Sequence, residues 1–178
     1  GLMNTPSNWL KWIFFLGKDK VLSDLRAVLK NGAAQGSYVD LLNRYMLGES
    51  WFCTISSEFL KAARDKGMTT AWQTLDFGDI REYALVVRKG ARNANAAKLI
   101  AVYLTSPEGI KFGLEEAKYG TLFQPGNYEH DIRLQNQKQG IPDVFGDRDV
   151  KYLEFSASKE APPLIKELSL ILQTGGGR

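Results

Sequence analysis

One stretch, residues 84–112, constrains the fold more than any other part of the 178-residue chain. It begins with a short apolar run, Ala84–Val87, which stops at a basic turn that ends at Gly90. Asn93 then stands where a helix N-cap would stand, and seven apolar residues follow at helical spacing before a Ser-Pro-Glu-Gly sequence stops the run. This order predicts a strand, a turn and a helix over residues 94–104.

Helical and strand-like patterns alternate along the rest of the chain. Short apolar runs predict a buried strand at Trp51–Ile55 and a further strand at residues 70–75. Apolar periodicity and capping residues predict the helices, at residues 9–16, 21–30, 58–66 and 110–119, after Ser37 and from Pro162 to Leu172. The alternation indicates an α/β fold, with a sheet flanked by helices. Residues 120–150 show no sustained period and are expected to be a covering loop or to contain short helices.

The composition excludes several classes of protein. A net charge of +3, from 23 basic and 20 acidic residues spread evenly, is too weak to argue for nucleic-acid binding. The sequence contains no run of 18 apolar residues, so no transmembrane helix is predicted, and no signal peptide is visible. The single cysteine, Cys53, lies in an apolar run and is expected to be a buried small hydrophobe. The chain has one histidine, His130, in a loop-like region, which is too few for a zinc site of the usual Cys/His spacing and leaves Cys53 without a base. The sequence also has no nucleophile elbow, P-loop or dinucleotide fingerprint, so no metal, cofactor or catalysis is expected.

The central stretch resembles the C-terminal portion of ABC-importer solute-binding proteins of family 1, which have the periplasmic-binding-protein type II fold. That family carries a strand followed by the sequence KGAKNPEAAKLFIDFLLSPEGQ. The matching residues here are Lys89–Asn93, Ala96–Leu99 and Ser106–Gly109. Weaker similarity extends over about residues 15–127. The resemblance implies an α/β lobe of type II and names no chemistry by itself.

The resemblance also implies where a ligand would be bound. In these proteins a short strand leads into a polar loop that touches the ligand, and the loop here is Ser56-Ser57-Glu58-Phe59. Ligands of open α/β sheets lie beyond the carboxyl ends of strands, where serine hydroxyls and helix N–H groups suit a small oxyanion or polar solute. Either serine could equally serve only to cap the following helix.

Two further residues complete the predicted site. Glu58 could meet a cation or an amine, although acidic residues also favour the first turn of any helix. Tyr38, at the start of another helix, corresponds to a position that often reaches the ligand cleft in the family. Ferric-ion members carry two tyrosines where this chain has Glu58 and Phe59, so we expect no tyrosinate iron site. The predicted ligand-binding residues are thus Ser56, Ser57, Glu58 and Tyr38.

The family's first lobe has no counterpart in the sequence. We therefore expect residues 1–90 to form the α/β portion of a second lobe, and residues 91–178 to form a helical C-terminal portion. In full-length relatives this portion returns to the first lobe before the terminal helix. The apolar face of the helix at residues 94–104 would then need another partner, and a homodimer of the fragment is one expectation.

The function implied by the resemblance is transport. The chain is expected to be part of a substrate-binding component that captures a small extracytoplasmic solute and delivers it to ABC permease subunits, without catalysis. Its expected location is periplasmic or lipid-anchored at the cell surface. The alternative is a ligand-sensing lobe of a regulator, or an enzyme, that reuses the same fold.

Overall fold

The computed structural model describes residues 2–82, 85–116 and 119–175 and divides the chain into two compact units. The first unit combines Gly1–Ser56 with Phe145–Arg178, and the second is Ser57–Val144. The division expected between residues 90 and 91 falls inside the second unit. That expected division describes lobes of full-length relatives rather than compact units of this chain, so it stays a prediction.

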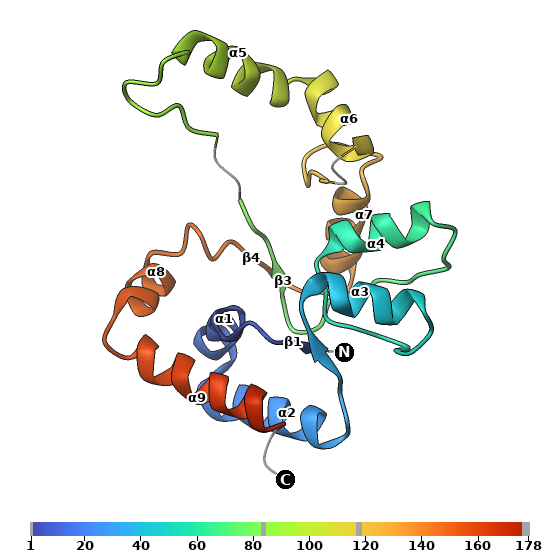
Figure 1. The fold of residues 1–178 in the computed structure, drawn as a ribbon, viewed down its shortest axis with the longest axis vertical. Coiled ribbons are helices and arrows are strands. Elements are labelled where there is room, and N and C mark those ends of the chain that lie inside the picture. Colours follow the sequence, from blue (N-terminus) through green and yellow to red (C-terminus); the bar gives the residue numbers. More distant parts are fainter. Residues whose placement is uncertain (1, 83–84, 117–118, 176–178) are drawn as a thin grey trace. The chain divides into compact units, whose positions relative to one another are not determined.

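The first unit is mostly helical (Figure 1). Its elements are β1 (Leu2–Met3), α1 (Pro6–Leu16), α2 (Lys18–Lys30), β2 (Gln35–Gly36), α3 (Tyr38–Met46), α8 (Val150–Ala157) and α9 (Ala161–Thr174). β1 and β2 form a two-stranded parallel sheet in which Leu2 lies opposite Gln35. Both ends of the chain contribute helices to this unit.

The core of the first unit lies where α1, α2 and α9 meet side by side (Figure 1). On α2, Val21, Leu22, Leu25 and Leu29 recur at helical spacing and are buried, which is the stripe that an amphipathic helix presents to a core. Leu168 of α9 is completely buried. The buried apolar cluster is Leu2, Ile13, Val21, Leu22, Leu25, Leu29, Leu168, Ile171 and Leu172.

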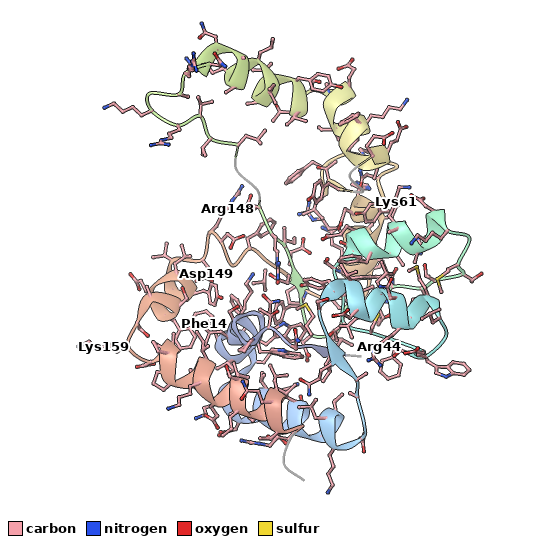
Figure 2. The ribbon with its side chains drawn as sticks, in the orientation of Figure 1. Phe14, Arg44, Lys61, Arg148, Asp149 and Lys159 are labelled. Carbon is pink, nitrogen blue, oxygen red and sulfur yellow. The ribbon has the colours of Figure 1, made fainter. Side chains whose placement is uncertain are left out.

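An aromatic cluster joins α1 to α8. The ring of Phe14, labelled in Figure 2, lies 5.5 Å from the ring of Tyr152 and 5.3 Å from that of Phe155, measured between centroids. These separations lie in the range in which aromatic pairs attract each other. Asp149, also labelled, begins α8 by accepting a hydrogen bond from the backbone N–H of Tyr152.

The second unit contains four helices and two short strands in its described part. They are α4 (Ser57–Asp65), β3 (Gly78–Asp79), α5 (Ala94–Leu104), α6 (Pro107–Glu116), α7 (Tyr128–Lys138) and β4 (Asp143–Val144). β3 and β4 pair in parallel, with Gly78 opposite Asp143. The Arg133 guanidinium on α7 donates to the Asp143 carboxylate at 2.8 Å, which ties this helix to the strand pair.

The helices expected from periodicity and caps are confirmed. α5 covers residues 94–104 as predicted and follows Asn93 at its N-cap position. Ser37 caps α3 through a capping box, because its hydroxyl accepts from the N–H of Asp40 while the Asp40 carboxylate accepts from the N–H of Ser37. α1, α2, α4, α6 and α9 also lie where helices were expected, within a few residues at each end.

The predicted strands are wrong where the structure describes them. Residues 51–55 and 70–75 form no strand, and neither do residues 85–87 of the third run; Ala84 lies outside the described residues. Trp51 and Phe52 are 94% and 78% exposed, so the expected buried strand at 51–55 is neither buried nor paired. A short apolar run is compatible with several conformations, and it becomes a strand only if the fold supplies a neighbour to pair with.

The structure supports a mixed, helix-rich α/β class with two small parallel sheets in its described part. The region expected to be irregular, residues 120–150, contains α7 and β4 and the first residue of α8. No helix among the described residues is long and apolar enough to cross a membrane.

Candidate functional site

The N-terminal ends of α4 and α7 are linked by a polar cluster in the second unit. Ser57, the first residue of α4, donates a hydrogen bond from its hydroxyl to the carboxylate of Glu129. Glu129 is the second residue of α7, and the side chain of its neighbour Tyr128 hydrogen-bonds to the same carboxylate. The carboxylate of Glu58 lies near enough to act on both groups electrostatically. We call Ser57, Glu58, Tyr128 and Glu129 the polar cluster.

The electrostatics of the polar cluster raise the pKa of the Glu129 carboxyl group. Burial raises the pKa of Glu129 above its ordinary value, and the negative charge of Glu58 raises it further. The hydrogen bonds from Ser57 and Tyr128 act in the opposite direction, because they stabilise the carboxylate. Burial also raises the pKa of Tyr128 strongly, with Glu129 as the next cause, so its phenol stays protonated.

Asn127 holds the start of α7, and with it Glu129, in place. It is 2% exposed, and its Oδ1 accepts hydrogen bonds from the backbone N–H groups of Glu129 and Thr121, each at 3.1 Å. It thereby caps α7 and fixes the preceding loop. Its Nδ2 group is buried and has no hydrogen-bond partner in the described structure. A buried donor of this kind needs an acceptor, which a solute or water oxygen would supply.

Gly120 allows the loop to approach Glu129 closely. A Cβ atom at this position would lie 2.1 Å from Cγ of Glu129 and 2.8 Å from Oδ1 of Asn127. Both contacts are shorter than atoms tolerate, so a residue with a side chain would push the carboxyl group or the capping amide out of place. The close approach of this loop contributes to the burial of Glu129.

A cavity of about 320 Å³ in the same unit is lined in part by Asn127. It lies between the start of α6 and the loop before α7, and Asn127 lines it as well as capping the helix that carries Glu129. Glu108 and Lys111 of α6 supply charges of both signs to its wall. The volume is at the lower end of the range for small-molecule sites. None of the four residues of the polar cluster is among the lining residues; Asn127, which precedes Tyr128 in the sequence, is the lining residue next to them.

The four residues predicted to bind a ligand fall into both units. Ser57 and Glu58 belong to the second unit and come together in the polar cluster. Ser56 ends a segment of the first unit, and its hydroxyl is buried without a hydrogen-bond partner in the described structure. Tyr38 is half-buried at the start of α3, also in the first unit. Ligand binding by all four stays a prediction.

The sequence interpretation missed Tyr128, Glu129 and Asn127. They lie in the region expected to be irregular, and Glu129 is 72 residues from Ser57 along the chain, so no local spacing connects them. One signal was present: Asn127 is a favoured N-cap residue, and the acidic residues Glu129 and Asp131 follow it in the first turn. His130, expected in a loop, lies in α7, and its buried Nδ1 is 3.7 Å from the carboxylate of Asp131.

The described residues contain no group of three or more His, Cys, Asp or Glu side chains placed to hold a metal ion. Cys53 is a free thiol of intermediate exposure, less buried than expected, and partial burial raises its pKa above the ordinary value. A raised pKa keeps the thiol protonated and weakly nucleophilic.

Comparisons with models of protein families, with curated proteins and with solved structures find no match for this chain.

Proposed function

We propose that the chain is the ligand-binding part of an ABC-importer solute-binding protein, with a fold related to one lobe of the type II class. It captures a small polar solute outside the cytoplasm and delivers this solute to permease subunits. It catalyses no reaction. The observation that carries this proposal is the polar cluster, in which Ser57 and Glu58 of the expected ligand loop meet Tyr128 and Glu129 at two helix N-termini.

The Ser-Pro-Glu-Gly sequence of the family signature has a local structural role that supports the resemblance. Ser106 accepts a hydrogen bond at its hydroxyl from the N–H of Gly109, at 3.1 Å, and Pro107 is the first residue of α6. A Cβ atom at position 109 would lie 2.0 Å from the carbonyl oxygen of Tyr103, so only glycine fits there. The sequence is thus suited to join two helices at a tight bend.

The chemistry of the cluster favours a solute that donates hydrogen bonds. Two carboxyl groups and two hydroxyls offer many acceptor oxygens, and the Glu58 carboxylate disfavours an anion nearby. Amine and hydroxyl groups are complementary to such a set. Among the solute classes compatible with the resemblance, we favour polyamines and sugars over organic acids and phosphonates.

The direct test is nuclear magnetic resonance of the ¹⁵N-labelled chain with a panel of solutes. The panel contains spermidine, putrescine, glucose, maltose, citrate and 2-aminoethylphosphonate. One lobe of a two-lobed site supplies only part of the contacts, so we expect a dissociation constant of about 1 mM and add each solute to about 10 mM. An amine or sugar should shift the amide signals of residues 56–60 and 127–130 in a saturable manner.

The signals of α9 serve as the internal control, because this helix is expected to take no part in binding. The proposal fails if no member of the panel shifts residues 56–60 and 127–130. It also fails if only citrate or the phosphonate does so, since the favoured solute chemistry would then be reversed.

A further inference from the structure

Helix α5 carries an exposed apolar stripe. All of α5 lies in the described part of the chain, and none of its residues is buried. Ala97, Ala101 and Leu104 are half-buried, so this face is partly covered. The exposed stripe consists of residues at the spacing of a single helix face, namely Ala96, Leu99, Ile100 and Tyr103. Leu99 is 71% exposed and Ile100 58%.

Such a stripe indicates a macromolecular partner, because exposed apolar side chains at i, i+3, i+4 and i+7 are the anchors of helix-to-helix contacts. The side chain at one end of the stripe, Ala96, is small, and the side chain at the other end, Tyr103, is large. Leu99 and Ile100 lie between them. If two copies pair antiparallel about a twofold axis, Tyr103 of each copy faces Ala96 of the other, and Leu99 faces Ile100.

The charges at the two ends of the stripe are complementary in the same way. Arg92 precedes α5, and Glu108 lies in the first turn of α6, just beyond the other end. Both residues are exposed. Antiparallel pairing brings Arg92 of one copy near Glu108 of the other, twice in each dimer. Parallel pairing would instead oppose tyrosine to tyrosine and arginine to arginine.

We propose that this chain forms a homodimer through the α5 stripe, with the two α5 helices antiparallel. The occupant of the stripe is therefore a second copy of the chain. The inference does not depend on the proposed solute binding, because no residue of α5 belongs to the polar cluster or lines the cavity; Glu108 is the one residue that the end contact shares with the cavity wall.

The size of the stripe limits the affinity. A helix of 11 residues is about 16 Å long, and one face of it covers less than the roughly 800 Å² that each partner buries in a standard interface. The dimer is therefore reversible, with an expected dissociation constant on the order of 10–100 μM.

Sedimentation velocity of the chain from about 5 μM to about 1 mM tests the proposal across that range. The wild type should pass from monomer to dimer, and Ile100→Glu should remain monomeric at every concentration. Leu170→Glu is the matched control, because Leu170 on α9 is 60% exposed and lies in the other unit. This control should dimerise like the wild type. A wild type that is monomeric at the highest concentration, or an Ile100→Glu variant that still dimerises, would overturn the proposal.

A charge exchange tests the contact between the ends. Arg92→Glu and Glu108→Arg should each weaken self-association at low salt, since each variant opposes like charges. An equimolar mixture of the two should associate at least as tightly as the wild type, because both end contacts are then oppositely charged. A mixture that associates no better than its components would show that these residues do not meet.

Site-specific cross-linking fixes the orientation. In a Cys53→Ser background, Ala96→Cys and Tyr103→Cys variants are mixed and treated with a short bifunctional thiol reagent. Antiparallel pairing predicts cross-links between position 96 of one copy and position 103 of the other. Products joining 96 to 96 and 103 to 103 in preference would refute the antiparallel arrangement.

Discussion

Glu129 lies in an environment unlike that of an ordinary surface carboxyl group. It is positioned by a serine hydroxyl, a tyrosine and a close loop backbone, and burial raises its pKa. None of these neighbours is adjacent to it in sequence except Tyr128. The resemblance predicts a ligand loop at 56–58, and that role stays a prediction. The contact of Ser57 with Glu129 could not be predicted, because the pairing of α4 with α7 is set by tertiary structure.

The raised pKa of Glu129 predicts a pH dependence of stability. Between the ordinary value of 4.5 and the raised folded value, the folded state binds more protons than the unfolded state. Stability contributed by this group is therefore present at low pH and is lost as the pH rises through the folded pKa. Glu129→Gln should remove this loss, so that α7 becomes more protected than in the wild type as the pH increases. Hydrogen exchange of the α7 amides across this window measures the effect.

Ser57→Ala tests how the hydrogen bond from Ser57 affects the pKa of Glu129. The serine hydroxyl lowers the pKa of Glu129 by stabilising its carboxylate, so the alanine variant should titrate at a still higher pH. The carboxyl carbon chemical shift of Glu129 reports the titration directly. A Glu129 signal that titrates at the same pH in both proteins would mean that the hydrogen bond to Ser57 is absent in solution.

At the scale of the helices, the sequence predicted an element correctly where apolar residues at helical spacing followed a capping residue. α5 and α3 were located by their N-cap residues and apolar spacing: α5 has the expected bounds, and α3 begins directly after Ser37 as expected. α7 was missed because its face is mostly polar and gives no periodic signal. The strands at 51–55 and 70–75 were wrong for a different reason: local composition cannot show whether a pairing partner exists.

Two glycines of α6 give opposite expectations for the same substitution. Gly109→Ala should destabilise the α5–α6 bend by about 1–3 kcal/mol, because the new methyl group meets the carbonyl oxygen of Tyr103. Gly113→Ala meets no atom within 4 Å and should stabilise α6 by about 0.5–1 kcal/mol, since alanine favours the helix. Chemical denaturation, followed by the amide signals of α6, compares the two. Equal effects would contradict the tight approach at position 109.

Capping provides another matched pair. Ser37→Ala removes the hydroxyl of the capping box and should destabilise α3 by ~1 kcal/mol. Asn93 occupies the N-cap position of α5 without a side-chain cap hydrogen bond. Asn93→Ala should therefore change the stability of α5 by less than about half of the loss expected for Ser37→Ala in α3. Helix-specific hydrogen exchange distinguishes them, and a larger effect at Asn93 would reverse this assignment.

At the scale of the whole molecule, the first unit depends on both ends of the chain. α1 and α2 bury their apolar faces against α9, so the core closes only when the C-terminal helix is present. The sequence predicted each of these helices but not their association, because apolar stripes are interchangeable and do not encode their partners. For the same reason it could not predict that the second unit is formed by residues 57–144.

Leu168 tests this core. It is completely buried, so Leu168→Ala should destabilise the first unit by about 2–5 kcal/mol through the cavity left behind. Leu170→Ala, two residues away on the exposed side of α9, should change the stability by less than ~0.5 kcal/mol. Trp9 and Trp12 pack against the cluster and report its unfolding by fluorescence. Similar losses for the two variants would contradict the placement of α9 on α1 and α2.

The most direct test of solute capture is the affinity of the best solute for three proteins: the wild type, Ser57→Ala and a control, Ser156→Ala. Ser156 lies on α8 in the first unit, and its hydroxyl donates only to the Leu153 carbonyl among the contacts seen. Loss of the Ser57 hydroxyl should weaken binding about threefold to tenfold, the effect of one hydrogen bond, while the control binds like the wild type. Equal affinities for the wild type and Ser57→Ala would remove the polar cluster from the binding site and contradict the proposed function.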